Sequence, residues 1–491
     1  MEQHHYLPEV AAALEKQRHL DEVATPESAS EKLSLLTELP PHFPEITREL
    51  RELTGSWNPV EIYTADPESI TREKAAFFEA TDRGETYHPS FSYSQAEKMN
   101  LEGVYERLLE MLAAVKETEI PKENRIARVS RAALIAKIRD DMATCELVHG
   151  IQTRDEAHIK RAINEKYQPL DDGLLSVAYQ VYERETSPKE ADSTPEGLLS
   201  EDEKEYLTTT MFDAQAIAQA FTWALEDMGI HAGDGTQAGF KVVIDPKSTS
   251  IDVRDKSVEG PTIFVPTTRV VTGKYLLNLL VHEIGSHARQ SMNGQRLFEV
   301  GGGPLKIDDE TLYEGLAMRA ERNLSTELFG ESSSVATALY TLAIEIASRG
   351  GSFSDVYRRI HEVVLHQELK IHPTADLPPD GEIPDKVREK ARSEGWRVAY
   401  RVMRGHTDMS NPEGYAMTKD LAYLRGQEID RELEEVGLGH LNEAAVLDGA
   451  GLRLVQEFNL TPADLPIKNT NLGRRYWEEV LKPQMLREQL T

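Results

Sequence analysis

One short stretch, residues 239–266, interrupts a sequence that otherwise reads as helical. It holds three short segments that are rich in β-branched residues and bounded by Pro, Gly or Asp: 239–245, 250–255 and 262–266. The apolar, helical segment LLNLLVHEIGSHARQ follows soon afterwards. This order predicts an α+β fold that is mainly α-helical, with a small antiparallel sheet in front of one buried helix.

The rest of the chain shows the three- and four-residue spacing of apolar side chains that is typical of amphipathic helices, most clearly in 100–118 and 124–148. Residues 186–205 are acidic and rich in Ser and Pro, which predicts an exposed linker. Several prolines in 370–387 predict a loop between helices.

These breaks divide the chain into three parts. We expect a mostly helical N-terminal region that ends in the acidic linker, a central region and a C-terminal tail: 1–205, 206–460 and 461–491.

The balance of charges excludes some kinds of partner. The 491 residues carry a formal net charge of −29, and such a surface repels phosphate backbones and anionic lipids. We therefore expect no nucleic acid and no membrane as partners. The N-terminus lacks the basic and apolar parts of a signal peptide, and the apolar run 276–281 is too short to span a bilayer, so we expect a cytoplasmic protein.

The single cysteine, Cys145, limits the chemistry of any metal site. One cysteine excludes a disulfide within the chain and a cage of thiolates. A metal ion would have to be bound by histidines and carboxylates.

The string His282-Glu283-Ile284-Gly285-Ser286-His287 has the form H-E-x-x-x-H. Zinc proteases commonly use H-E-x-x-H, in which a four-residue step places both imidazoles on one helix face. A five-residue step turns an ideal helix through about 500°, which leaves the two rings about 140° apart. A π-bulge would bring them together, and Gly285 is a residue that would ease such a distortion.

A third ligand would come from the segment DDETLYEGLAMRAE, which carries acidic N-terminal signals and then reads as a helix. Glu314 is the candidate, and Glu310 and Glu321 remain rivals by charge alone. Two histidines and one carboxylate leave the fourth position of a zinc ion open for water, as in catalytic sites. Glu283 is then placed to act as general base.

The same form occurs a second time, at His361, Glu362 and His366. This copy lies in a charged amphipathic helix, without preceding strands and without a following acidic helix. It therefore indicates side chains on a helix face rather than a second metal site.

Several motifs together resemble the tyrosine carboxypeptidase family, which includes the microtubule-associated tyrosine carboxypeptidases of animals and bacterial homologues. The similarity covers roughly residues 40–460. The motifs are HEIGSH, Asn293-Gly294, Glu314-Gly315-Leu316-Ala317, Arg404-Gly405, Gly414, Thr418-Lys419-Asp420, Tyr423-Leu424 and Gly426.

The resemblance implies a metallopeptidase of one zinc ion in the central region, with His282, His287 and Glu314 as ligands and Glu283 as the catalytic glutamate. It also implies a mainly helical, zincin-like fold with a small sheet over the active-site helix. Relatives commonly have Glu or Gln where this chain has Tyr313, which favours Glu314 as the ligand.

The C-terminal motifs supply groups that a carboxypeptidase needs. A cation must bind the terminal carboxylate of the substrate, and a donor must stabilise the oxyanion beside the metal. Arg404 and Lys419 are the candidates for substrate binding, and Tyr423 for the catalytic donor. The family usually has an aromatic residue before Thr418, whereas this chain has Met417, which alters the expected wall of a pocket.

We therefore expect a zinc-dependent peptidase, a carboxypeptidase that acts on the C-terminus of a peptide or protein. Animal relatives act on tubulin, whose acidic tails match poorly with a chain of charge −29, so a different substrate is expected. Two alternatives stay open. One is an aminopeptidase or dipeptidyl-peptidase of the H-E-x-x-x-H kind, and the other is a non-catalytic regulator whose zinc ion only stabilises the fold.

Overall fold

The structure is a computed structural model of the 491-residue chain. It describes residues 11–16, 40–54, 57, 62–122, 124–186, 197–232, 239–248, 250–254, 260–297, 310–330, 335–444, 452, 456, 461–468 and 471–488.

The N-terminal part of the described chain is helical, as its apolar spacing predicts. The two segments that the sequence marks most clearly form α7 and α8, and Asn124 caps α8 by accepting a hydrogen bond from the Ala127 backbone. The helices of this part are α3 (His42–Thr54), α5 (Pro67–Asp82), α6 (Ser94–Lys98), α7 (Val104–Glu117), α8 (Arg125–Thr153), α9 (Glu156–Lys166) and α10 (Asp172–Thr186).

Helix α11 (Glu201–Thr209) begins inside the predicted linker. Ser200 and Glu203 form a capping box there, in which each side chain bonds to the other residue's backbone N–H. This cap starts a helix in an acidic sequence, so the linker is shorter than expected. Residues 187–196 lie outside the described part.

The predicted strands form a three-stranded sheet of β2 (Lys241–Asp245), β4 (Thr262–Pro266) and β3 (Asp252–Arg254), in that order. Strands β3 and β4 are antiparallel, as expected, whereas β2 and β4 are parallel. The chain reverses twice between β2 and β4, which makes these two strands run the same way. Strands β1 (Met211–Phe212) and β5 (Val271–Thr272) form a second, antiparallel pair.

The segment after β5 is a single long helical stretch that contains the H-E-x-x-x-H string. It consists of α13 (Gly273–Leu279), the π-helix η1 (Leu280–Ala288) and α14 (Arg289–Leu297). Helix α12 (Ala214–Asp227) and strand β3 contact η1. Helix α15 (Glu310–Phe329) packs along it from the other side, where the sequence predicts the helix with the third ligand.

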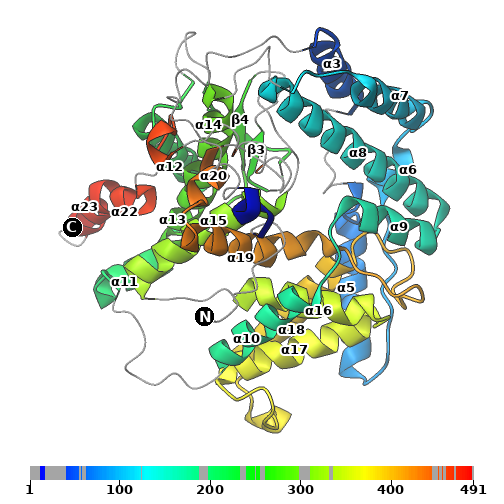
Figure 1. Ribbon diagram of the computed structural model, residues 1–491. Helices are drawn as coiled ribbons and strands as arrows, with labels where there is room; N and C mark the ends of the chain where they lie inside the picture. The colour runs from blue at the N-terminus through cyan, green and yellow to red at the C-terminus, as the bar shows by residue number, and fades with distance from the viewer. Residues whose placement is uncertain are drawn as a thin grey trace.

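Four helices of the lower part of Figure 1 lie together under α19 (Leu421–Glu435): α10, α16 (Val335–Ser348), α17 (Phe353–Leu369) and α18 (Asp385–Val402). The proline-rich segment between α17 and α18 is a loop with one 3₁₀ turn, η2 (Asp380–Glu382), as predicted. The remaining elements are η3 (Thr418–Asp420), α20 (Gly439–Ala444), η4 (Pro462–Asp464), α22 (Leu472–Tyr476), η5 (Trp477–Leu481) and α23 (Lys482–Glu488).

The buried apolar side chains form separate clusters, and one of them joins the N-terminal and central parts. Phe77, Leu174 and Tyr182 share a core with residues of α16, α17 and α18. Another cluster surrounds η1 and includes Leu276, Leu280 and Ile284. The helix that carries the H-E-x-x-x-H string is therefore packed in an apolar core, to which Leu324 and Leu328 of α15 also belong.

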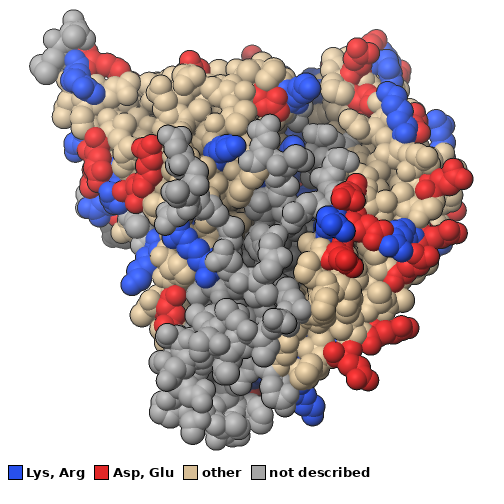
Figure 2. All heavy atoms as spheres, turned by 90° about the horizontal axis from the view of Figure 1, so that it is seen from above, with Lys and Arg blue, Asp and Glu red and all other residues tan. Residues whose placement is uncertain are grey.

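The described helices include none that is long and apolar enough to cross a membrane. On the face in Figure 2, acidic and basic side chains are interspersed.

Candidate metal centre

The H-E-x-x-x-H string lies in the π-helix η1, which confirms the distortion that the spacing predicts. The backbone N–H of Arg289 donates to the carbonyl of Ile284, five residues back, as π-helical bonding requires. Ser286 Oγ donates to the carbonyl of Val281, also five residues back, at 2.9 Å. This wider turn places residues five apart on one side of the helix.

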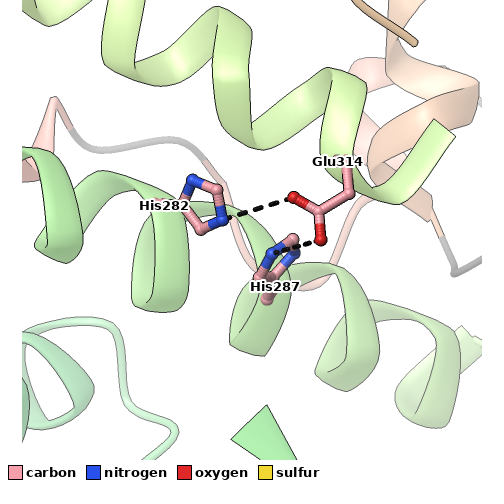
Figure 3. A group of neighbouring side chains, drawn as sticks. All are labelled: His282, His287 and Glu314. Atoms are coloured by element: carbon pink, nitrogen blue, oxygen red, sulfur yellow. Dashed lines mark ion pairs between the residues drawn. The ribbon is translucent and has the colours of Figure 1, made fainter. Parts of the chain in front are cut away.

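His282 and His287 accordingly point toward the same place, and Glu314 of α15 reaches it from the facing helix (Figure 3). The imidazole centroids are 4.7 Å apart. One ligand atom of each residue lies within 4.8 Å of the others. The structure thus brings together the three predicted ligands.

The separations inside this group suit a metal ion. His282 Nε2 lies 3.5 Å from Glu314 Oε2, and His287 Nε2 lies 3.9 Å from Oε1. These separations are long for hydrogen bonds. Two ligand atoms of a tetrahedral zinc ion, each about 2.1 Å from the metal, are about 3.4 Å apart. Two imidazole nitrogens and one carboxylate therefore fit a zinc ion with little movement.

Glu321 contacts the far side of His282. Its Oε1 is 2.5 Å from His282 Nδ1, which leaves Nε2 to face Glu314. Carboxylates commonly hold metal-binding imidazoles in this way. Glu321, a rival for third ligand by sequence, is thus a partner of a predicted ligand. The side chain of Glu310, the other rival, lies outside the described part.

The carboxylates around His282 dominate its protonation. Burial works to lower the pKa of His282, but Glu314 and Glu321 outweigh it and raise the pKa well above its usual value. The site therefore attracts positive charge, whether a proton or a metal ion.

Glu283 is half-buried next to the first ligand. The loss of water around its carboxylate raises its pKa to about 7; the charge of His282 opposes this rise, and Glu314, Glu321 and Asp252 add to it. A carboxylate with a pKa near neutrality both accepts and releases a proton at neutral pH, as a general base and acid must.

A close helix crossing fixes Glu314 relative to Tyr423. Gly315 of α15 meets Gly426 of α19, and a Cβ atom on either glycine would overlap the backbone of the other helix. Tyr423 lies one turn before Gly426, so this crossing places its side chain near Glu314. The charge of Glu314, followed by burial, raises the pKa of Tyr423. This hydroxyl therefore stays protonated at neutral pH.

The two predicted substrate-binding cations lie close to Tyr423 in sequence or space, and both are buried. Arg404 Nε donates to the carbonyl of Arg401 at 3.0 Å, and its Nη2 is 3.5 Å from Asp420. Lys419 belongs to the 3₁₀ turn η3, directly before α19.

Met417, the departure from the family pattern, is fully buried and packs with Tyr63 and Tyr93 in a core cluster. Tyr313 stacks on His287 with centroids 3.6 Å apart and planes 13° apart. An aromatic ring therefore covers His287, one of the predicted ligands.

No family model matches this chain, and neither a curated protein nor a solved structure matches it.

The second H-E-x-x-x-H string forms no such group in the described part of the chain. It lies in the ordinary α-helix α17, where the two histidines point in different directions. His361 stacks on Tyr357, and both ring nitrogens of His366 lie 3.0 Å from backbone carbonyls, those of Glu362 and Ala375. The contacts of this copy are therefore those of side chains that pack a helix.

A layer of buried polar side chains fixes the end of the metal-site helix. Asn293 of the family motif donates to the carbonyls of Glu443 and Ile467 and accepts from the backbone of Ile467. Gln290 donates to the carbonyl of Asn442 at 2.5 Å. These contacts tie α14 to α20, so the role of Asn293 is structural.

Proposed function

We propose that the protein is a zinc-dependent peptidase, and more closely a carboxypeptidase that removes residues from the C-terminus of a peptide or protein. The observation that carries this proposal is the convergence of His282, His287 and Glu314 beside the carboxylate of Glu283. When bound there, zinc would supply a Lewis acid for the scissile carbonyl and would lower the pKa of its water ligand.

Glu283 is the residue that moves the proton. It takes a proton from the attacking water and later delivers it to the leaving amine. Its raised pKa supports both directions of transfer, and a cation nearby would lower that pKa and favour the basic form.

Tyr423 donates a hydrogen bond to the oxyanion that forms at the scissile carbonyl. The negative charge of Glu314 holds its pKa above the usual range, so the hydroxyl keeps the proton that it must donate. A donor aimed at such an oxyanion stabilises the transition state more than the substrate.

The arrangement of sheet and helix supports a zincin-like fold. Strand β3 is an edge strand that contacts η1, and Asp252 of this strand is close enough to Glu283 to raise its pKa. We infer that the sheet covers the active-site helix.

The C-terminal polarity rests on the charges beside Tyr423. Arg404 and Lys419 are cations, and a cation is what a terminal carboxylate requires. An aminopeptidase would instead need carboxylates to bind a free amine. The resemblance to the tyrosine carboxypeptidase family points the same way.

A peptide library, digested by the purified protein and analysed by mass spectrometry, tests the proposal. We expect wild type to remove C-terminal residues, Glu283→Gln to remove none while it keeps its metal, and Glu362→Gln of the second string to match wild type. Cleavage from the N-terminus would keep the metal chemistry and contradict the polarity. Identical behaviour of wild type and Glu283→Gln would contradict the enzyme and support a metal that only stabilises the fold.

A further inference from the structure

Two guanidinium groups outside the predicted site residues converge on one phenol near the metal centre. Arg401 Nη1 donates to the Tyr340 hydroxyl at 3.1 Å, and Arg397 Nη1 donates to the same oxygen. Both guanidiniums lie over the Tyr340 ring, at 4.8 and 5.3 Å from its centroid. Each guanidinium also pairs with a carboxylate, Arg397 with Glu394 and Arg401 with Asp420.

Arg401 also reaches the metal centre through Tyr423. Its Nη2 donates to the Tyr423 hydroxyl at 3.2 Å, and Tyr423 lies near Glu314 because of the helix crossing at Gly315 and Gly426. The four side chains Arg397, Tyr340, Arg401 and Tyr423 form a row, which we call the arginine–tyrosine row, and it ends at Tyr423, near Glu314.

Asp420 fixes the orientation of this row. It is fully buried and accepts from Arg401 Nε at 3.0 Å and from Nη2 at 2.8 Å. Arg404 Nη2 lies 3.5 Å from Oδ2 of the same carboxylate, the oxygen that also accepts from Arg401 Nε. Arg404 therefore helps to hold the carboxylate of Asp420 in place, and that carboxylate holds the guanidinium of Arg401 in place. In this arrangement Arg401 is pre-organised and still keeps an Nη1 group that faces Tyr340.

The hydroxyl groups of the row have hydrogens to donate. Each phenol oxygen accepts from arginine, and no acceptor for either phenol hydrogen lies within hydrogen-bond distance among the described residues. The side chains of Arg397 and Arg401 remain 41% and 29% exposed. A ligand with two acceptor oxygens and a negative charge would satisfy the Tyr340 phenol and the remaining guanidinium hydrogens together, and would leave the Tyr423 hydroxyl for the oxyanion.

The local charge also favours an anion. Arg397, Arg401, Arg404 and Lys419 face two acids, Asp420 and Glu394, apart from Glu314 at the metal site. This cluster is cationic within a chain of net charge −29.

We propose that Tyr340, Arg397 and Arg401 of the arginine–tyrosine row bind the terminal carboxylate of the substrate, while Tyr423 at the end of the row remains the donor to the oxyanion. This proposal rests on the carboxypeptidase function proposed above, and it names the contacts that set the polarity of cleavage. One residue separates the scissile carbonyl of such a substrate from its carboxylate, a span of about 3.8 Å. The anchor must therefore adjoin the metal centre, as the row does at Tyr423. Arg404, the residue that the motif indicates, positions Asp420 behind the row.

A binding experiment tests this site without relying on catalysis. The Glu283→Gln protein is the parent, and the probe is a degenerate pool of fluorescent decapeptides, prepared once as free acids and once as amides. We expect the parent to bind the acid pool at least about ten-fold more tightly than the amide pool, as charge-assisted bonds to a carboxylate require.

Two substitutions in the row should remove this preference. Tyr340→Phe keeps the ring but loses the donor, and Arg397→Gln removes one cation from a half-exposed position. Each should weaken acid binding about five- to ten-fold and leave amide binding within about two-fold. Arg392→Gln is the matched control, because Arg392 lies on the same helix but pairs with Asp82.

The outcomes separate the site from the enzyme. Three outcomes would contradict the proposed site. The parent could bind both pools equally, it could bind neither pool, or both variants could keep the preference for the acid pool. If wild type cleaves C-terminal residues but both variants keep the acid preference, the protein is a carboxypeptidase whose arginine–tyrosine row does not bind the terminal carboxylate. A preference that the variants abolish, in a protein that cleaves nothing, would establish the site and contradict the peptidase.

Discussion

Single residues around the predicted metal ligands set the orientation of the ligand side chains, and Glu321 is the clearest example. It holds His282 Nδ1 at 2.5 Å and so presents Nε2 to the site. We expect Glu321→Gln to weaken metal binding about 10- to 100-fold, because the imidazole loses its orientation and some basicity. Competition with a chelating dye measures this. Glu327→Gln, further along α15 and paired with Arg474, is the control; equal affinities in both variants would contradict this role.

A second residue, His406, makes stability depend on pH. Its ring is fully buried and stacks on Tyr415 at 3.8 Å, and neither ring nitrogen has a hydrogen-bond partner among the described residues. Burial lowers the pKa of His406 to about 3, although Asp408 opposes the shift. In the unfolded chain a histidine has a pKa of about 6.5. The unfolded state therefore binds the proton first, and stability falls as the pH drops from about 6.5 toward 3.

His406→Phe should remove this dependence while keeping the stack on Tyr415. Between pH 7 and pH 5, we expect wild type to lose about 2 kcal/mol more free energy of unfolding than the variant. Urea denaturation at both pH values measures the difference. Equal losses in the two proteins would show that His406 is not buried in its neutral form.

At the scale of secondary-structure elements, the π-helix could be predicted because a five-residue step between the two predicted histidine ligands leaves few other solutions. The role expected for Gly285 was not needed: a Cβ atom there would make only ordinary contacts, the nearest at 3.7 Å. The hydrogen bonds of Ser286 and Arg289 stabilise the wide turn instead. Such contacts depend on which helix face is buried, and the string alone does not fix that.

The sequence also could not indicate the contacts between elements that lie far apart. Glu321 and Glu314 both read as acids on one helix, and only the packing of α15 on η1 shows which of them faces the histidine nitrogens. Tyr340 and Arg401 have no motif, and they meet because α16 and α18 pack together. The small sheet was predicted from its β-branched segments, but the parallel pairing of β2 with β4 depends on strand order.

The crossing of α15 and α19 gives a prediction at this scale. Gly315→Ala should destabilise the protein by about 3 kcal/mol or more, since the new methyl group would overlap the backbone of Gly426 and force the helices apart. Gly285→Ala, in the same site but with free space, should change stability by less than about 1 kcal/mol. Thermal unfolding of both variants measures this. A Gly315→Ala protein as stable as wild type would contradict the close crossing.

For the whole molecule, the N-terminal residues belong to the same folded body as the rest of the described chain. Phe77 and Tyr182 share a core with α16 to α18, and Arg425 bonds to Asp171 at 2.6 Å. Glu156 accepts a hydrogen bond from Tyr415 at 2.5 Å. A break in composition near residue 205 predicts a boundary in the sequence, but it does not reveal a core that crosses this boundary.

Removal of residues 1–205 should therefore prevent folding of the remainder. We expect the fragment 206–491 to aggregate, or to unfold without a cooperative transition in urea, because it exposes the apolar face of α16 to α18. Co-expression with residues 1–205 should restore a soluble complex. A fragment that unfolds cooperatively by circular dichroism, with a stability close to that of the full chain, would contradict the shared core.

The metal content of a small set of variants tests the central claim most directly. Purified wild type, Glu283→Gln and Glu362→Gln are each expected to hold about one zinc ion per chain by elemental mass spectrometry, because none of these changes removes a ligand. Glu314→Ala and His287→Ala, dialysed in parallel and checked for folding by circular dichroism, are expected to hold almost none. The metal centre would be contradicted if folded Glu314→Ala held as much zinc per chain as wild type. It would also be contradicted if wild type held no zinc after zinc had been added.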